Sequence, residues 1–228
     1  MKQWLALCAC VALVGCGRIE PQPVNTTSDW PATRDAIIEE YLEAHPAYAV
    51  YQGRHEYDGL LPDWSASGIA AEITRLHAAK DAIVALDLAG AERFERDYMA
   101  ARFDRDLFWL ETAEAPFTNP AWHLDWIVDN IDPAPYLTRT YAPLDVRMKA
   151  YTAYARAIPQ AAAQIRANLR TPLSKPLAER GISAFGGLAG FYASDVPKVF
   201  ANVTDAALQK ELTEANGGAA TAMQDLAA

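Results

Sequence analysis

The sequence predicts an all-α fold in which several amphipathic helices form a multi-helix array. Alanine is very common and β-branched residues are sparse and scattered, a composition that favours helices over strands. Apolar residues recur at three- and four-residue spacing along most of the chain, which is the period of a helix with one buried face. Without its N-terminal segment the chain keeps about 210 residues, enough to bury a core as one large domain or two small ones.

The first sixteen residues have the pattern of a bacterial lipoprotein signal. Met1-Lys2-Gln3 is a short basic start, an apolar run follows, and Leu13-Val14-Gly15 leads into Cys16. The run is too short to cross a bilayer core of about 30 Å, and its place at the extreme N-terminus argues against an ordinary buried helix. We expect a signal peptide over residues 1–15, lipid on Cys16 and a polar tether over residues 16–29. The protein should then lie in the cell envelope, anchored in the outer membrane and facing the periplasm.

The cysteines and the net charge restrict the partners of the exported chain. All three cysteines, Cys8, Cys10 and Cys16, lie in or at the end of the signal, which excludes an internal disulfide and a cysteine-based zinc site. The formal charge is −9, and −10 once Lys2 leaves with the signal, so nucleic acid is not an expected partner. No basic amphipathic helix is visible, and the N-terminal lipid should provide the membrane contact. The oligomeric state does not follow from the sequence.

The helical region is expected over residues 30–228. Its first helix runs from Trp30 to the His45-Pro46 step, where the proline ends or kinks it. A second helix begins with Ser65 or Ser67 as its N-cap and stops near residue 90. A third helix is expected over about residues 92–114. The charge pairs expected on its solvent side are Glu92–Arg96 and Arg102–Asp106.

The rest of the chain continues this pattern around an aromatic, proline-broken stretch at residues 119–143, which should hold one short helix near 123–131. A long helix follows from about Leu144 to Leu169, and Pro159 can introduce a kink there. Shorter helices are expected near 176–180 and 184–193, and a last one from Thr204 or Asp205. Because the final residues still favour a helix, we expect the chain to stop inside an element.

The densest group of polar side chains lies between the first two long helices, in the segment from Gly53 to Ser65. His55, Asp58 and Asp63 stand there beside two glycines, and loops that carry such groups on a rigid scaffold are common sites. A structural interpretation explains the same residues. Asp58-Gly59 suits a turn, Asp63 and Ser65 suit helix capping, and His55 can fasten the loop. Both interpretations remain open at the level of the sequence.

No catalytic residue and no metal ligand can be assigned from the sequence. The four histidines are His45, His55, His77 and His123, and no two of them are four residues apart, as a mononuclear zinc hydrolase requires on one helix. His77 and Asp81 share a helix face and are interpreted as a surface pair. His123 lies among aromatic residues and is interpreted as a core histidine with its hydrogen bonds satisfied. No serine lies in a Gly-x-Ser-x-Gly elbow.

These residues resemble a known family. The run Gly53-x-His55-x-Tyr57-Asp58-Gly59-x-Leu61-x-Asp63-x-Ser65, which follows Tyr41-Leu42 and Pro46, is similar to the opening of the bacterial family called domain of unknown function 885. Further matches are Asp104-x2-Leu107-Phe108-Trp109-Leu110-Glu111, Asn119-Pro120, Arg139-x-Tyr141-Ala142-Pro143, Arg147 and Pro159-x9-Leu169. The resemblance covers nearly all of the expected mature chain.

The resemblance implies an exported or lipid-anchored all-α protein related to candidate zinc metallopeptidases of the His-Glu-x-x-His type. Members of the family run to more than twice this length, and their zinc-binding helix lies in the C-terminal half. Zinc is therefore a cofactor expected of the full-length family, and no zinc ligand carries over to a residue of this sequence. The chain is expected to be an incomplete part of a larger helical peptidase-like fold that walls a cleft for a peptide substrate. His55, Asp58 and Asp63 are expected to line that cleft or to be structural.

Two hypotheses follow. In the first, the chain is the N-terminal region of a peptidase-like lipoprotein and is inactive alone. In the second, it is a short helical periplasmic binding or scaffold lipoprotein without enzymatic activity.

Overall fold

The computed structural model describes residues 29–125 and 130–228, and every regular element within these ranges is helical. The all-α prediction is confirmed. The predicted signal peptide, Cys16 and nearly all of the tether lie outside the described residues. None of the described helices is both long enough and apolar enough to cross a membrane.

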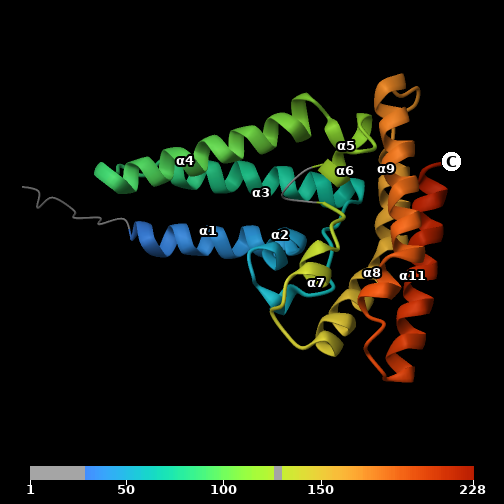
Figure 1. The fold of residues 1–228 in the computed structure, drawn as a ribbon. Coiled ribbons are helices and arrows are strands. Elements are labelled where there is room, and N and C mark those ends of the chain that lie inside the picture. Colours follow the sequence, from blue (N-terminus) through green and yellow to red (C-terminus); the bar gives the residue numbers. More distant parts are fainter. Residues whose placement is uncertain (1–28, 126–129) are drawn as a thin grey trace, which may run out of the picture.

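The N-terminal part forms an extended arm of helices that lie side by side (Figure 1). Its elements are α1 (Trp30–Ala44), α2 (Pro46–Tyr51), the 3₁₀ turn η1 (His55–Tyr57), α3 (Ala66–Val84), α4 (Gly90–Leu107) and the π-helical turn η2 (Phe108–Thr112). Asp29 caps α1 and Ser65 caps α3, since each side chain accepts a hydrogen bond from a first-turn N–H. The buried side chains of the arm include Trp30, Ile37, Leu76, Ile83, Phe103 and Leu107.

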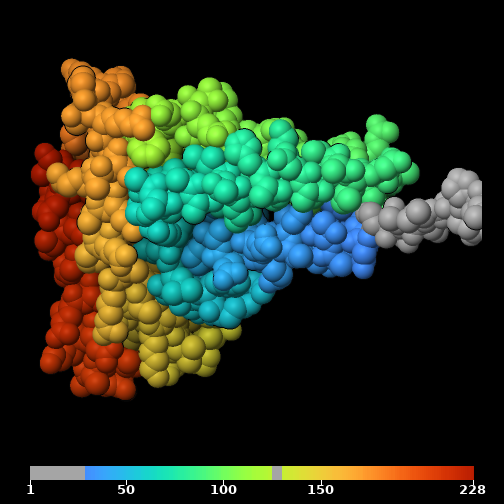
Figure 2. Space-filling view, turned by 180° about the vertical axis from the view of Figure 1, so that it is seen from behind, coloured from blue at the N-terminus to red at the C-terminus, as the bar shows by residue number. Residues whose placement is uncertain are grey.

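The C-terminal part is a layer of three long helices, α8 (Leu144–Asn168), α9 (Lys175–Ser194) and α11 (Ala206–Leu226), with the short α10 (Val196–Val199) between the last two. Figures 1 and 2 show this layer standing across one end of the arm. Asp205 caps α11 by accepting from the N–H groups of Ala207 and Leu208, as its position predicted. Large rings fill the layer, among them Tyr151, Tyr154, Phe185, Tyr192 and Phe200.

Short elements connect the two parts: α5 (Ala115–Thr118), α6 (Trp122–Asp125) and α7 (Ala134–Thr138). The short helix predicted over 123–131 corresponds to α6, Ile131 lies outside any helix, and residues 126–129 fall outside the described ranges. The α8 helix continues through Pro159.

Two predicted boundaries are wrong. The two short helices expected at 176–180 and 184–193 are one continuous helix, α9. Gly181 lies inside this helix and allows close packing, since a Cβ at this position would lie 2.8 Å from Pro120 Cγ. The helix from Ser65 ends at Val84, and Gly90, with φ of +58°, begins the next one. The helix predicted over about residues 92–114 corresponds to α4 and η2 together, with a π-helical turn after Leu107.

The predicted charge pairs of that helix are also wrong. Arg96 binds Asp97 and the carbonyl oxygen of Leu86 in place of Glu92. Asp106 is buried and pairs with its neighbour Arg105.

Candidate functional site

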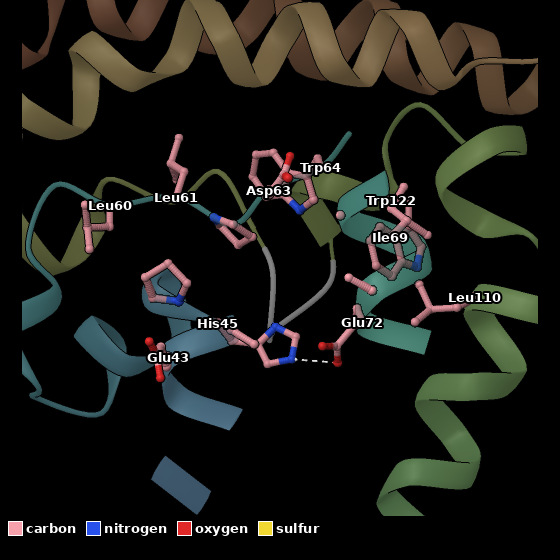
Figure 3. Close-up of a pocket in the computed structure, with 15 residues that line it drawn as sticks. Glu43, His45, Leu60, Leu61, Asp63, Trp64, Ile69, Glu72, Leu110 and Trp122 are labelled. Carbon is pink, nitrogen blue, oxygen red and sulfur yellow. Dashed lines mark hydrogen bonds and ion pairs between the residues drawn. The ribbon is translucent and has the colours of Figure 1, made fainter. Parts of the chain in front are cut away.

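A pocket of about 390 Å³ opens where the arm meets the loop that precedes α3 (Figure 3). Its size falls within the range of small-ligand sites in proteins, about 300–1,000 Å³. The walls are mainly apolar. They comprise Pro46, Leu60, Leu61, Pro62, Trp64, Ile69, Leu110 and Trp122. The polar lining residues are Glu43, His45, Asp63 and Glu72.

One side of the pocket carries a buried histidine–carboxylate pair. His45 Nε2 lies 3.1 Å from Glu72 Oε1, and both side chains are largely buried. Arg75 donates to the same carboxylate through Nε at 2.7 Å and an NH2 nitrogen at 2.6 Å. Burial opposes ionisation of Glu72, but the hydrogen bonds from His45 and Arg75 and their positive charge hold its pKa below the usual value. Glu72 is therefore a carboxylate held ionised at an apolar pocket.

Local sequence explains how this pair is positioned. His45 is the single residue between α1 and α2, because Pro46 cannot continue the first helix. The backbone N–H of His45 donates to the carbonyl oxygen of Tyr41 and so closes the end of α1. Glu72 follows Ile69 by three residues on α3, so both project from one face of that helix. The pair joins residues 27 positions apart, and no local pattern in the sequence could reveal it.

Asp63 lines the same pocket, on the side opposite His45 and Glu72 (Figure 3). Its Oδ1 accepts from the Ser65 N–H at 3.0 Å and from Gln164 Nε2 at 2.7 Å. These hydrogen bonds lower the pKa of Asp63, and the bond from the Ser65 backbone has the largest effect. Gly68 permits this turn, since a Cβ there would lie 2.1 Å from the Asp63 carbonyl oxygen. Asp63 therefore combines a helix-capping role with a place at the pocket wall.

His55 and Asp58 lie apart from the residues that line the pocket. His55 Nδ1 is 3.0 Å from Asp58 Oδ1, and the Tyr141 hydroxyl donates to Asp58 Oδ2 at 3.0 Å. The His55 ring also stacks on Tyr141, with centroids 3.5 Å apart and planes 9° from parallel. Burial, together with the charge of Asp58, raises the pKa of Tyr141, which keeps its hydroxyl a donor. The cluster fastens η1 to the segment before α8, so of the three predicted residues Asp63 alone reaches the pocket.

His123 differs from the prediction. It is fully buried, with its ring near those of Trp64 and Trp122 at 5.0 and 5.1 Å, yet neither ring nitrogen has a hydrogen-bond partner within the described ranges. His123 is a core histidine, as predicted, but the prediction that its hydrogen bonds are satisfied is wrong within the described residues. Burial lowers the pKa of His123 to about 3, so the ring is neutral at physiological pH.

The predicted pair of His77 with Asp81 is also wrong, because His77 Nε2 contacts Glu111 Oε1 at 3.0 Å across the arm. Among the residues that the structure describes, no three His, Cys, Asp or Glu side chains form a group that could hold a metal ion. The described residues therefore offer no donor set for the zinc that the family resemblance implies.

The fold and the pocket define an all-α protein in which a helical layer supports an arm with a mainly apolar binding pocket. The chain belongs to the family described as bacterial protein of unknown function (DUF885), whose profile matches residues 46–228. Among solved structures it is similar to a candidate lipoprotein of unknown function from Shewanella oneidensis, with a TM-score of 0.76 and 17% sequence identity. The match covers 88% of this chain but 36% of that protein, and it shows a shared fold. A search of curated proteins found no match.

Proposed function

We propose that this chain forms the N-terminal wall of a peptide-binding cleft in an exported, lipid-anchored protein. The observation that carries the proposal is the pocket of about 390 Å³, which combines apolar walls with the buried His45–Glu72 pair. Apolar walls with a few fixed polar groups suit one apolar side chain of an extended peptide. The family resemblance supports a peptide as the substrate class.

Individual residues have distinct roles in this proposal. Leu60, Leu61 and Trp64 would contact the apolar side chain, with Trp122 on the far wall. The Trp64 indole nitrogen is buried and has no hydrogen-bond partner in the described part of the chain, so it can donate to a peptide carbonyl. His45 and Arg75 would keep Glu72 ionised as an acceptor for a peptide N–H.

The proposed role is binding, with no peptide hydrolysis by this chain alone. Metal-assisted hydrolysis needs a donor set for the ion, and the described residues do not provide one. If relatives of this chain are zinc peptidases, their metal ligands lie in segments that this chain does not match, because it covers 36% of the solved relative.

The pocket is tested by Leu60→Ala, which shortens an exposed wall residue without opening the core. The probe is the blocked tetrapeptide acetyl-Ala-Leu-Ala-Ala-amide, titrated calorimetrically into the full chain, with the Asp-for-Leu peptide as a specificity control. We expect binding of the Leu peptide to weaken about fivefold, or about 1 kcal/mol, because part of its apolar contact is lost. The matched control is Ile182→Ala on α9, which is equally exposed at 53% and remote from the pocket. Equal effects of both variants, or equal binding of both peptides, would contradict the assignment.

The anchor is tested separately at Cys16. Cells that express the native chain should incorporate labelled palmitate into it and should retain it in the outer-membrane fraction, whereas Cys16→Ser should abolish both. Recovery of the native chain in a soluble fraction, without incorporated label, would overturn the proposed lipid anchor. It would leave the pocket proposal intact.

A scaffold role without ligand binding is the second candidate. It is favoured by the hydrogen bonds of His55, Asp58 and Asp63, which all fasten the loop before α3 to neighbouring segments. The absence of any measurable peptide binding, together with cooperative unfolding of the purified chain, would support this candidate over the first.

A further inference from the structure

A second pocket, of about 440 Å³, lies in the arm and shares no lining residue with the first. It is bounded by residues of α1, α2 and α4. Its apolar surface comes from Ile37, Ile38, Met99 and Phe103. Ile38 is 41% exposed and leaves an apolar edge at the pocket. The pocket therefore has the size and lining of a site for an apolar ligand.

The charged residues that line this pocket are both arginines, although the chain as a whole carries a formal charge of −9. Arg54 is already neutralised, because it donates two hydrogen bonds of 2.9 Å to Glu39 and another to Glu56. Arg102 differs from Arg54. It interacts with the Tyr41 hydroxyl and, electrostatically, with Asp106, but no close ion pair joins it to a carboxylate within residues 29–125 and 130–228.

The nearest acidic group on α4 does not satisfy Arg102. Asp106 stands one turn further along the helix, and it accepts hydrogen bonds from Arg105, including one of 2.7 Å from Nε. Burial raises the pKa of Asp106, which further weakens it as a counter-ion. Arg102 is thus a half-buried guanidinium beside an apolar pocket, with hydrogen-bonding capacity for an incoming anion.

We propose that this pocket binds a free fatty acid. The carboxylate would accept hydrogen bonds from Arg102, and the acyl chain would lie against Ile37, Ile38, Met99 and Phe103. One planar guanidinium suits one carboxylate, and the apolar lining suits an unbranched chain better than a polar ligand. The positive charge of Arg102 should favour binding of a fatty acid over a phospholipid acyl ester or an alcohol, because these have no carboxylate. The inference does not depend on peptide binding at the first pocket.

The experiment is calorimetric titration of the purified full chain with dodecanoate below its critical micelle concentration. Dodecanol and dodecyltrimethylammonium serve as ligands with the same tail and no negative charge. We expect dodecanoate to bind at least tenfold more tightly than either one, and Arg102→Gln to remove that preference. The control Arg156→Gln changes an exposed arginine of α8 that pairs with Glu211, and it should leave dodecanoate binding unchanged.

A second variant keeps the proposal testable if Arg102→Gln folds poorly. Ile38→Glu places a negative charge at the exposed edge of the pocket and should weaken dodecanoate binding at least tenfold. Its control is Val146→Glu on α8, a residue of similar exposure (44%) far from the pocket. No binding of dodecanoate, equal binding of the three ligands, or unchanged binding in Ile38→Glu would each overturn the proposal.

Discussion

The arm and the layer bury different kinds of side chain. In the layer, buried hydroxyls are paired internally: Tyr151 donates to Asn216 at 2.6 Å, and the Tyr154 and Tyr192 hydroxyls lie 3.1 Å apart. In the arm, the buried or nearly buried polar groups include two carboxyl groups, those of Glu72 and Asp106. The two pockets described above open on the arm, and a further pocket of about 550 Å³ lies between α8 and α11 of the layer. The layer therefore resembles an ordinary structural core, whereas the arm holds polar groups that are costly to bury.

Under the proposed function, this difference assigns support to the layer and ligand binding to the arm. Burial of charged groups rarely stabilises a protein more than apolar side chains of similar volume would. The His45–Glu72–Arg75 cluster is therefore not expected to add much to stability. Buried ionisable groups at a pocket are more typical of a functional site. Among its described buried residues the layer has one charged side chain, Arg147 of α8, which donates to backbone carbonyl oxygens of Tyr136 and Ala142. The rest of its core consists mainly of aromatic and aliphatic side chains.

The two regions meet at Trp64, His123 and Trp122. Trp64 belongs to the core of the layer and Trp122 to that of the arm, and the His123 ring lies near both. Two hydrogen bonds of the Trp64 backbone join this residue to α8. Its backbone N–H donates to Gln164 Oε1 at 3.1 Å, and its carbonyl oxygen accepts from Asn168 Nδ2 at 2.6 Å. This junction holds the first pocket against the layer.

The largest predicted effect is in the layer. Phe185→Ala removes a ring that is 1% exposed and should lower the free energy of unfolding by about 3–5 kcal/mol, because a cavity replaces its contacts. The control Phe94→Ala removes a ring of α4 that is 72% exposed and should change stability by less than about 0.5 kcal/mol. Urea unfolding at pH 7 measures both, and similar losses in the two variants would show that the layer is not the main support.

A smaller effect is expected at the junction and depends on pH. The pKa of His123 is lowered to about 3 in the fold, against 6.5 for an exposed histidine, so the unfolded chain takes up a proton first as pH falls. Stability from this residue is complete above pH 6.5 and declines below it by about 1.4 kcal/mol per pH unit until about pH 3.

The variant His123→Phe tests this decline. It keeps an aromatic ring beside Trp64 and Trp122 and removes the ionisable nitrogens. Between pH 7 and pH 5 the native chain should lose about 2 kcal/mol more than the variant does, measured by urea unfolding at each pH. Replacement of the exposed His77 by Gln serves as the parallel control and should retain the native decline. Parallel curves for the native chain and His123→Phe would refute the assignment.

Most of the fold could be predicted from the sequence because its helices are marked locally. Ser65 and Asp205 stand where capping residues are expected, and both accept hydrogen bonds from first-turn N–H groups. The failure at α9 has the opposite origin. The sequence predicts two short helices on either side of Gly181, but this residue lies inside one continuous helix, where its missing side chain leaves room for Pro120.

The candidate site was much less predictable. Asp63 could be found because the family motif includes it. The sequence marks His45 as the end of a helix and carries no signal at Glu72, because the pairing of these two residues depends on how α1 and α3 pack. The same is true of His123, whose unsatisfied nitrogens are defined by neighbours far along the chain such as Trp64. Helix boundaries are local properties, whereas the polarity of a pocket is a property of the packed molecule.

The smallest effect is expected in the loop between α2 and α3, where two glycines provide a matched pair. Gly53 and Gly59 have φ of +93° and +85°, so alanine is strained at both, by about 1 kcal/mol. At Gly53 a Cβ would meet open space, whereas at Gly59 it would lie 2.6 Å from the Ala153 Cβ on α8. Gly59→Ala should therefore cost about 1–2 kcal/mol more than Gly53→Ala in urea unfolding, because α8 must give way. Equal costs would mean that backbone strain alone decides both positions and that the loop does not pack firmly on the layer.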